Sequence, residues 1–378
     1  MPRVEVVTSL DALDPRAWDT MARGCSAYHT HGWLSMFEEP GHMWYAVARG
    51  HDDRLLGALP MACVPDESSE LYRASDLFAG LPGPWHDGAA LHAGPRRGYH
   101  HELVLDPALG GRERAAVLRS LLDAAGQIMQ DGGLTACLAY YLTSAACREL
   151  MDAAGAAVPL LTETNATLDL PGTGFEDYLA AFGPRRGRIA REIALFDAAG
   201  YEVSIEPVSR AWPEAGPLRA NVERRYGHAV TDEEMTALLR RHAENVDAMA
   251  RVVCCRREGR LVGCSVFLER GDTLYLRMVG FDYPRLRDAC EYFNVLFYLP
   301  VRYAYETGRR RVDFGLGSPA KAFRLARLRP LWTLAFNAAA HGPEVEAAAS
   351  AWNGERMARW RAEFGRHSPQ EELSPRRT

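Results

Sequence analysis

The sequence contains only one lysine, Lys321, among its 44 lysine and arginine residues, so arginine carries nearly all of its positive charge. The formal net charge of −5 at pH 7 argues against a protein that coats nucleic acid over its whole surface. No apolar run approaches the roughly 20 residues that cross a membrane, and the N-terminal MPRVEVVTSL has no apolar signal segment. We therefore expect a cytoplasmic protein without a membrane partner.

The cysteine spacing typical of metal sites is also missing. Eight cysteines are present, but none forms a CxxC pair. Several of them stand in apolar stretches, which is typical of small buried hydrophobic residues. Histidine offers an alternative set of ligands, His29 and His31 with His100 and His101. Because no carboxylates cluster with these histidines, the sequence favours reduced, structural cysteines and no bound metal.

What the sequence does contain is a long internal repeat. Residues 44–65 have the pattern of a strand, a turn and a second strand, and residues 251–269 repeat this hairpin. In both copies the second strand begins with the sequence RLxG. In each copy a strand, a long amphipathic helix and another strand follow. The first strands end at Asp106 and Asp282, and the helices are expected over 112–130 and 288–307. A repeat of this length predicts a duplicated domain, and the cleft between two domains is a usual place for a small molecule.

The two copies differ in length between hairpin and central strand. Gly57 and Asp106 are 49 residues apart, whereas Gly263 and Asp282 are 19 apart, so the first copy carries 30 more residues. Most of them lie in 66–99, which is rich in Gly, Pro, Trp and His and too irregular for one regular element. Long irregular segments inside compact domains are often binding loops. We expect this inserted loop to shape a substrate site.

The order of hairpin, strand, long helix, strand, short helix and strand resembles the acetyltransferase fold called GNAT. Its repetition in one chain resembles the Fem-type aminoacyltransferases that build peptidoglycan bridges, together with their relatives that use aminoacyl-tRNA to form amides. Three segments carry the resemblance: SAYHTHGWLSMFE, FGPRRGRIAREIALFDAAGYEV and EYFNVLFYLPVRYAYETGRRRVDFGLGSPAKAFRLARLRPLWTLAF.

This resemblance implies an α+β fold with two tandem GNAT-like domains, each a mixed, mostly antiparallel sheet flanked by helices. We expect the first domain over 1–165, including the inserted loop 66–99, and the second over 166–342. A C-terminal helix and a flexible tail are expected over 343–378. In this fold a bulge in the central strand usually offers a backbone amide to the reacting carbonyl, and no covalent enzyme intermediate is required.

The chain departs from the pattern where enzymes of this fold bind coenzyme A. Those enzymes hold the pyrophosphate in a glycine-rich turn at a helix N-terminus, where backbone amides and the helix dipole meet the anion. The second copy has YPRLRD at 283–288, which contains no glycine, and the first copy has Gly110-Gly111. A two-glycine turn is equally typical of an ordinary strand–helix connection. The sequence therefore favours a donor other than acyl-CoA.

By resemblance, we expect an amide-forming transferase that moves an aminoacyl group from aminoacyl-tRNA to the amine of a small metabolite or peptide-like acceptor. Such an enzyme needs no bound cofactor and would serve natural product biosynthesis as a monomer or weak dimer. The segment 175–200 has no room for the long paired-helix arm of peptidoglycan-bridge enzymes, which favours a small acceptor. An acyl-CoA-dependent N-acyltransferase is the alternative, and a non-catalytic binding module on the same fold is a third reading.

Amide formation from an ester needs acid–base groups and donors for an oxyanion. The catalytic candidates are His86 and Asp87 in the inserted loop and Tyr298 on the predicted helix, where Pro300 is expected to cause a kink that aims Tyr298 into the cleft. Loop histidines more often make local hydrogen bonds, and aromatic residues at helical spacing are more often core. The candidates for substrate binding are Trp85, His101, Tyr292, Asn294, Arg302, Lys321 and Arg324.

Two groups of arginines are candidates for contacts with tRNA phosphates. The alternative is that they are solvated helix faces and turns. By resemblance, Lys321 and Arg324 lie where the family contacts the phosphates of the donor or a carboxylate of the acceptor; arginine suits bidentate recognition and lysine acts as a point charge. The tRNA-binding candidates are Arg185, Arg186, Arg188 and Arg191 in one group and Arg309 and Arg310 in the other.

Overall fold

The computed structural model describes residues 2–64, 67, 69–82, 90–336 and 342–369. The chain divides into two compact units. The first unit is Met1–Asn165 together with Leu328–Thr378, and the second is Ala166–Arg327. Each unit is a mixed, mostly antiparallel sheet flanked by helices, which confirms the predicted α+β class with two tandem domains.

The sheet of the first unit is ordered β1-β2-β3-β4-β6-β13-β7, with β5 paired to β3 beside this path. Strands β4 and β6 are parallel, whereas the other pairs with known register are antiparallel. The strands are β1 (Arg3–Val7), β2 (Met43–Arg49), β3 (Leu55–Ala62), β4 (Ala90–Ala93), β5 (Val104–Leu105), β6 (Ala136–Thr143), β7 (Val158–Asp169) and β13 (Arg327–Phe336).

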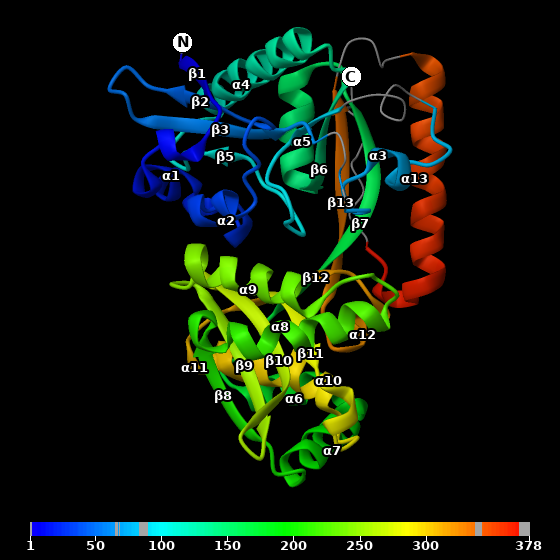
Figure 1. Cartoon of the computed structure of the whole chain (residues 1–378). Helices are drawn as coiled ribbons and strands as arrows, with labels where there is room; N and C mark the ends of the chain where they lie inside the picture. Colours follow the sequence, from blue (N-terminus) through cyan, green and yellow to red (C-terminus); the bar gives the residue numbers. More distant parts are fainter. Residues whose placement is uncertain (1, 65–66, 68, 83–89, 337–341, 370–378) are drawn as a thin grey trace. The chain divides into compact units, whose positions relative to one another are not determined.

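Helices cover both faces of strands β1–β3 in the first unit (Figure 1). The long helix α4 buries Val117, Leu118, Leu121, Ala125 and Met129 along one stripe, at the spacing that keeps side chains on one helical face. Helices α1 and α2 lie on the opposite side of these strands in Figure 1. The helices of this unit are α1 (Pro15–Met21), α2 (His31–Met36), α3 (Ala74–Leu77), α4 (Gly111–Gly132), α5 (Ser144–Ala154) and α13 (Pro343–Phe364).

The inserted loop contains a strand that the sequence did not reveal. Strand β4 pairs with β3 through Met61↔Ala93 and with β6 through His92↔Leu138. It is only four residues long, ALHA, and therefore too short to show a period. The stretch before Asp106, expected to be the central strand, contributes only the two residues of β5.

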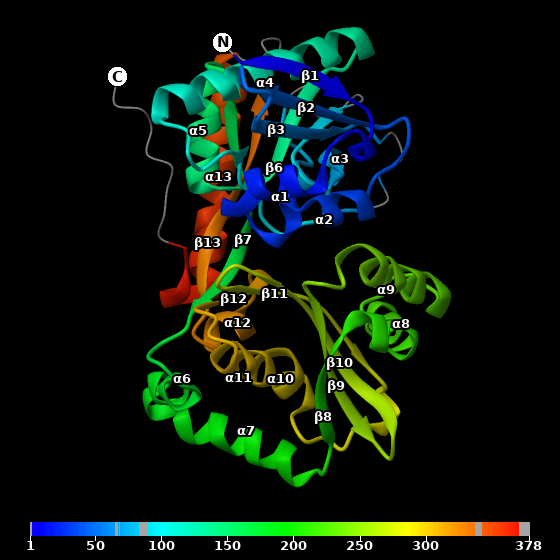
Figure 2. The ribbon, with the colours of Figure 1, turned by 90° about the vertical axis from the view of Figure 1, so that its left-hand side faces the viewer.

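The second unit has the sheet order β12-β11-β10-β9-β8. The β11–β12 pair is parallel and the others are antiparallel. Figure 2 shows α8 and α9 on one face of this sheet and α10 and α11 on the other. The strands are β8 (Glu202–Pro207), β9 (Ala250–Arg257), β10 (Arg260–Arg270), β11 (Thr273–Phe281) and β12 (Arg311–Leu316). The helices are α6 (Phe175–Ala181), α7 (Arg186–Ala198), α8 (Val208–Arg225), α9 (Asp232–Val246), α10 (Glu291–Phe293), α11 (Leu299–Glu306) and α12 (Pro319–Phe323).

The helix expected over 288–307 begins later and is interrupted. Its first turn is α10, a π-helical segment follows over Asn294–Tyr298, and α11 completes it. Pro300 stands in the first turn of α11 and has no N–H to donate to the preceding turn, which accounts for the local change of winding.

The C-terminal boundary also differs from the expectation. Residues 328–342 were expected in the second domain, but Leu328–Thr378 belongs to the first unit. The reason is that β13 pairs with β6, with Leu331 opposite Thr143 and Phe336 opposite Cys137. Helix α13 also bonds to strand β7, because Trp352 Nε1 donates to the Leu161 carbonyl at 3.0 Å. The expected tail includes 370–378, which lie outside the described residues.

Candidate active site

The central strand of the second unit, β11, carries a bulge, and its parallel partner β12 pairs with it along only part of its length. In the pairing with β10, Val266 is opposite Met278 and Phe267 is opposite Leu276, so Arg277 is the extra residue of β11. Strands β11 and β12 are in register only from Thr273–Tyr275 with Arg311–Asp313, although β11 continues to Phe281 and β12 to Leu316. The two strands therefore part next to the bulge.

Lys321, the only lysine of the sequence, bonds to the C-terminal end of β12, where this strand no longer pairs with β11. Lys321 lies on α12, which Ser318 caps, and its Nζ donates to the carbonyl of Leu316, the last residue of β12, at 2.6 Å. Burial lowers the pKa of Lys321 to about 8, although the nearby carboxylate of Asp313 opposes this shift. An ammonium carries three donors, so this bond leaves capacity for a substrate oxygen. A lysine with this pKa can act both as a cation and as a proton donor near neutral pH.

In the turn after β11, here called the closed turn, backbone amides donate hydrogen bonds to the side-chain carboxylate of Glu291. Glu291 is 4% exposed, and its Oε1 accepts hydrogen bonds from the Arg287 amide at 2.8 Å and from the Tyr201 hydroxyl at 2.6 Å. Its Oε2 accepts from the Ala289 amide at 2.9 Å. These amides belong to the turn where coenzyme A enzymes of this fold would hold a pyrophosphate. The carboxylate of Glu291 therefore already accepts hydrogen bonds from two amides of this turn.

Tyr298 points into the interior of the second unit, so the expectation that it faces a cleft is corrected. Its hydroxyl donates to Glu192 Oε2 on α7, and Arg324 Nη2 donates to the same oxygen at 3.0 Å. The Arg324 guanidinium also lies over the ring of Phe293, 3.7 Å from its centroid. Tyr298, Glu192 and Arg324 are all buried, and their polar groups bond to one another. Tyr298 and Arg324 thus join α7 to the π-helical segment and α12.

The remaining candidates of the second unit, Asn294, Arg302 and Tyr292, differ in their surroundings. Asn294 is buried, and its side-chain amide donates to the Glu192 carbonyl at 3.1 Å, so it supports the same network. Arg302 lies over the ring of Phe175 at 4.9 Å, where it packs α11 on α6. Tyr292 is exposed on α10. Of the predicted substrate contacts in this unit, Tyr292 is exposed, whereas Lys321 is largely buried with one donor bonded to the Leu316 carbonyl.

The predicted tRNA contacts form two groups at opposite ends of β12. Arg309 and Arg310 stand at its start, where Arg309 donates to the Gly271 carbonyl. Arg185 and Arg188 stack on Phe323, at 4.4 Å and 5.1 Å from its centroid, beyond the other end of the strand. A six-residue strand spans about 17 Å, so these groups do not form one patch.

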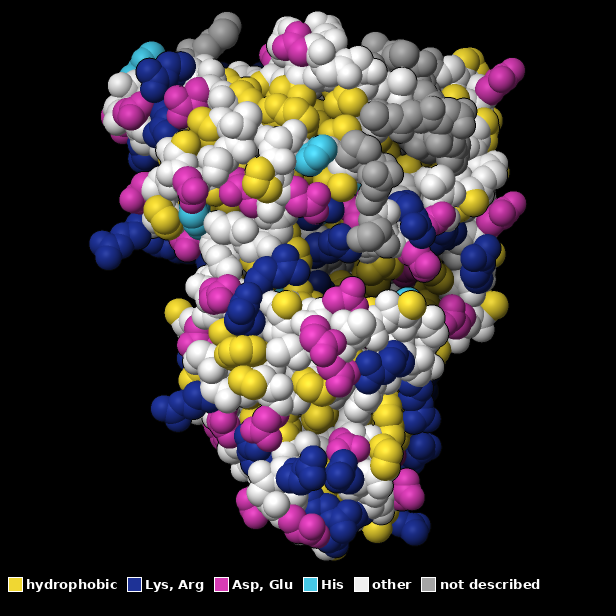
Figure 3. All heavy atoms as spheres, viewed as in Figure 1, with side chains coloured by type: hydrophobic (Ala, Val, Ile, Leu, Met, Phe, Trp, Pro, Cys, Tyr) yellow, Lys and Arg dark blue, Asp and Glu magenta, His cyan; other side chains and the backbone are white. Residues whose placement is uncertain are grey.

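Two of the predicted tRNA-binding arginines near α7 form ion pairs. Arg186 binds Glu176 at 2.8 Å and Arg188 binds Glu192 at 3.1 Å, whereas Arg191 is exposed on α7. Figure 3 shows acidic side chains between the basic ones over this part of the second unit. The surface is therefore of mixed charge rather than uniformly basic.

Comparison with known proteins agrees with this architecture. Residues 183–323 match the family described as acetyltransferase (GNAT) domain. These residues form a GNAT acetyltransferase domain, and the chain is an acyltransferase. The matched range covers the bulged β11, the closed turn and Lys321. A comparison of the sequence with curated proteins finds no match.

Solved structures extend the likeness to most of the chain. FemX has a TM-score of 0.61 at 12% identity, over 88% of this chain and 97% of that one. L-PGS from Bacillus licheniformis has a TM-score of 0.55 at 12% identity, over 90% and 97%. The C-terminal domain of a protein from Agrobacterium fabrum, described as a lysylphosphatidylglycerol synthetase, has a TM-score of 0.56 at 11% identity, over 92% and 97%. At these identities the likeness shows a shared fold.

The GNAT-like first unit has an open turn where the second unit has a closed one. Gly110 and Gly111 precede and begin α4, and the Gly110 amide donates to the exposed Glu113 at 3.2 Å. A Cβ built on Gly111 meets nothing within 4 Å. This turn therefore has open space beside Gly111, whereas amides of the turn in the second unit are bonded to Glu291.

An ionic cluster in the first unit joins the inserted loop to Glu39. Arg96 pairs with Glu67 at 2.5 Å and with Glu39 at 2.6 Å. His92 and Tyr140 lie nearby with ring centroids 4.9 Å apart, and burial lowers the pKa of His92 to about 4. The predicted Trp85, His86 and Asp87 fall outside the described residues, so substrate binding by Trp85 and catalysis by His86 and Asp87 stay predictions.

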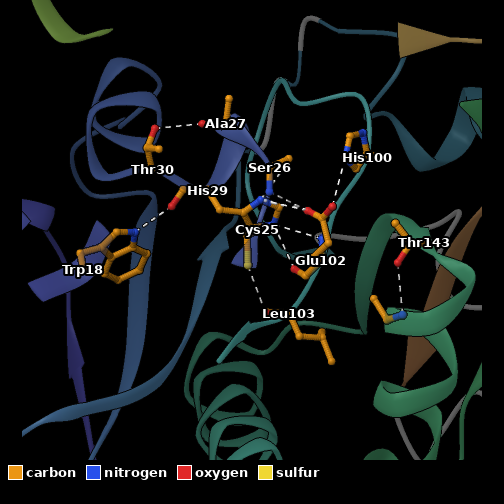
Figure 4. Close-up of polar contacts among 11 residues, drawn as sticks. Trp18, Cys25, Ser26, Ala27, His29, Thr30, His100, Glu102, Leu103 and Thr143 are labelled. Carbon is orange, nitrogen blue, oxygen red and sulfur yellow. Dashed lines mark hydrogen bonds and ion pairs between the residues drawn. The ribbon is translucent and has the colours of Figure 1, made fainter. Parts of the chain in front are cut away.

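A second polar cluster surrounds Glu102 (Figure 4). His100 Nε2 lies 3.1 Å from Glu102 Oε1, and His29 Nδ1 lies 3.4 Å from Oε2 and 3.0 Å from Ser26 Oγ. Burial alone would raise the pKa of Glu102, but His100 and His29 lower it to about 2. Ser26 is 1% exposed and His29 0%, so this Ser–His–Glu arrangement joins two chain segments and presents no nucleophile.

The predicted substrate contact His101 lies next to this cluster and is also buried. Its backbone amide donates to the Tyr141 carbonyl at 2.8 Å, and burial lowers the pKa of its side chain to about 3. A neutral histidine held in the interior is a core residue in this arrangement, which corrects the expectation that it contacts a substrate.

The residue that the sequence reasoning missed most clearly is Glu291. One signal was available, because acidic residues are favoured in the first turn of a helix, and Glu291 stands near the start of the predicted helix. Its partner Tyr201 is 90 positions away and carries no such signal. In the described part of the chain, no group of three or more metal-ligating side chains is found, and no helix has the length and apolarity of a membrane span.

Proposed function

We propose that this acyltransferase moves an aminoacyl group from aminoacyl-tRNA to the amine of a small or peptide-like acceptor. The observation that carries the proposal is that Glu291 binds the amides of the turn after β11 in a GNAT domain that also contains Lys321 at the end of β12. Glu291 takes the amides that a coenzyme A pyrophosphate would need, while Lys321 uses one of its three donors on the Leu316 carbonyl at the end of β12. An aminoacyl ester of tRNA is activated for aminolysis and needs no pyrophosphate site.

The reaction joins the acceptor nitrogen to the ester carbonyl and breaks the bond from that carbonyl to the ribose oxygen. The neutral amine attacks, and the tetrahedral intermediate carries a negative oxygen that preorganised donors stabilise. The Lys321 ammonium is suited to this role, because its site is partly dehydrated and its pKa is about 8. The departing ribose oxygen takes a proton, and the attacking nitrogen loses one, so no proton is gained or lost overall.

The test is a donor competition read by mass spectrometry. The purified protein is incubated with total charged tRNA or with acyl-CoAs, each with a pool of soluble amines or with phosphatidylglycerol vesicles, and new amides or esters are sought. We expect an aminoacyl amide of a soluble amine that depends on charged tRNA. An acyl product that forms only with acyl-CoA would overturn the donor, and an aminoacylated lipid would overturn the acceptor class.

The second candidate is an acyl-CoA-dependent N-acyltransferase, and the open Gly110–Gly111 turn of the first unit favours it. The space around Gly111 would admit an anion at the N-terminus of α4. Gly111→Glu would fill that space with a carboxylate. If the acyl-CoA reading holds, this variant loses activity, whereas transfer from charged tRNA should be unaffected.

A further inference from the structure

Three tyrosines gather on the surface of the second unit beside the turn that Glu291 closes. Tyr226, at the C-terminal end of α8, is 72% exposed, and Tyr292 on α10 is 40% exposed. Tyr283 belongs to the turn after β11, and both Tyr283 and Tyr292 have ring centroids within 6.2 Å of Phe281. A tyrosine that exposes most of its ring is unusual for a side chain that only supports a fold.

The last turn of α8 holds this group together. The Asn221 side chain donates to the Phe281 carbonyl at 3.1 Å, which fixes α8 against the end of β11. One position before Tyr226, the Arg225 guanidinium lies over the Tyr283 ring, 4.4 Å from its centroid. Burial first, and then the neighbouring phenols of Tyr226 and Tyr283, raise the pKa of Tyr292, as expected for three close hydroxyls.

The charge around these rings is positive. The segments 219–228 and 282–288 contain five arginines and three acidic residues. Three of these arginines form ion pairs, Arg219 with Glu223, Arg224 with Asp232 and Arg285 with Asp282. Arg225 and Arg287 are exposed. Flat, exposed aromatic rings with arginines between them are the pattern of proteins that bind single-stranded nucleic acid, because bases stack on the rings and phosphates meet the cations.

We propose that Tyr226, Tyr283 and Tyr292, with Arg225 and Arg287, form a stacking platform for the single-stranded 3′ end of an RNA donor. This inference rests on the proposed function and names the surface that would receive the donor. The platform adjoins the turn that other enzymes of this fold use for a nucleotide cofactor. Because Glu291 fills the inner side of that turn, the nucleotides of an RNA would be held by their bases on the outer side.

Fluorescence anisotropy with two labelled RNA hairpins tests the platform. One hairpin carries a single-stranded 3′ tail and the other is blunt. We expect the protein to prefer the tailed hairpin, and Tyr226→Ala or Tyr292→Ala to weaken its binding by roughly five- to a hundredfold per lost ring. Binding of the blunt hairpin should not change. Tyr226→Phe and Tyr292→Phe should keep the preference, because they keep the stacking face.

Val203→Ala is the matched control, since Val203 is 41% exposed in the same unit on β8. The platform is overturned if the alanine variants keep the full preference for the tail, or if sedimentation shows that Tyr226→Ala separates a dimer, which would make this surface a contact between copies. Charged-tRNA transfer by the same variants separates the two proposals. Transfer that persists in Tyr226→Ala with unchanged affinity removes the platform alone, whereas absence of tRNA-dependent transfer in the unmodified protein removes the proposed function.

Discussion

Both units have a turn between a strand and a helix, but the two turns differ in whether a buried carboxylate already holds their backbone amides. In the first unit the turn before α4 keeps Gly110 and Gly111 and has open space around it. In the second unit the turn before α10 has no glycine, and the buried carboxylate of Glu291 accepts its amides. One turn could still receive a phosphate, while the other already holds an internal anion. A shared fold therefore does not imply a shared cofactor.

The units also differ in the helix that follows the last strand of the repeat, which is α5 in the first unit and α12 in the second. In the first unit α5 comes after β6 and contains no lysine, whereas in the second unit α12 comes after β12 and carries Lys321. The feature suited to an oxyanion and the closed turn thus occur in the same unit. On the proposed function, this combination favours the second unit as the place of the transfer.

The largest effect is expected at Lys321. Lys321→Ala should reduce the turnover number by about 10²–10³, the usual cost of losing one oxyanion donor. Because only the protonated amine stabilises an oxyanion, the turnover number of the unmodified protein should fall as pH rises through about 8. Lys321→Arg should move this decline to higher pH. A pH–rate profile by single-turnover mass spectrometry measures both, and a profile unchanged in Lys321→Arg would contradict the role.

The same lysine gives a control for misfolding. Its folded pKa lies below the ordinary value of 10.5, so at pH 7 the charged form is disfavoured by burial. That penalty is relieved as pH rises from about 8 to 10.5. Lys321→Met should therefore unfold with a free energy up to about 3 kcal/mol higher at pH 7, while its activity is lost. Urea unfolding at pH 7 provides the measurement.

The comparison of the two turns can be tested by removing one carboxylate from each. Glu291→Ala should cost about 2–4 kcal/mol in the free energy of unfolding, because two amides and the Tyr201 hydroxyl lose a buried partner. Glu113→Ala removes an exposed contact and should cost about 1 kcal/mol or less. Added pyrophosphate should restore stability to Glu291→Ala by taking the vacated position. Equal losses in the two variants would mean that the turns are equivalent.

Acid should affect the first unit more than the second. Burial lowers the pKa of His92 to about 4 and of His101 to about 3 in the first unit, and of His242 to about 4 in the second. The unfolded chain takes up these protons first as pH falls below 6.5, so stability is lost on the acid side. From pH 7 to 5 each histidine costs about 2 kcal/mol. Hydrogen exchange resolved by unit should show about 4 kcal/mol lost in the first and about 2 in the second.

Much of the fold could be predicted because hairpins and long helices are local. The hairpins expected at 44–65 and 251–269 are β2–β3 and β9–β10, and the helix expected over 112–130 is α4. Strand β13 could not be assigned correctly, because its partner β6 is almost 200 positions away. The repeat therefore predicted the elements but not the pairing of β13 with β6 in the first unit.

The candidate site was harder to predict because its contacts are distant in sequence. Lys321 could be singled out as the only lysine. Tyr298 and Arg324 were chosen for their chemistry, but Glu192, more than a hundred positions before them, pairs with both in the interior. Spacing along a helix shows which side chains share a face and does not show which face is buried.

The smallest effects are expected from the arginines. Arg186→Glu with Arg191→Glu and, separately, Arg309→Glu with Arg310→Glu should distinguish the two ends of β12. The pair that meets RNA phosphates should lower the slope of log affinity against log salt by about 1 for each arginine. Arg185 and Arg188 are unsuitable for this test, because they pack on Phe323. If neither pair changes the slope, these groups are solvated faces.

Hydrogen exchange of the segment 283–293 tests the central claim most directly, because it contains the amides of Arg287 and Ala289 that Glu291 holds. Exchange is followed by mass spectrometry with acetyl-CoA and with a stable analogue of aminoacyl-tRNA. We predict that the tRNA analogue slows exchange in this segment and that acetyl-CoA leaves it unchanged. Slower exchange with acetyl-CoA and no change with the analogue would contradict an enzyme whose GNAT domain has exchanged a coenzyme A site for an RNA-borne donor.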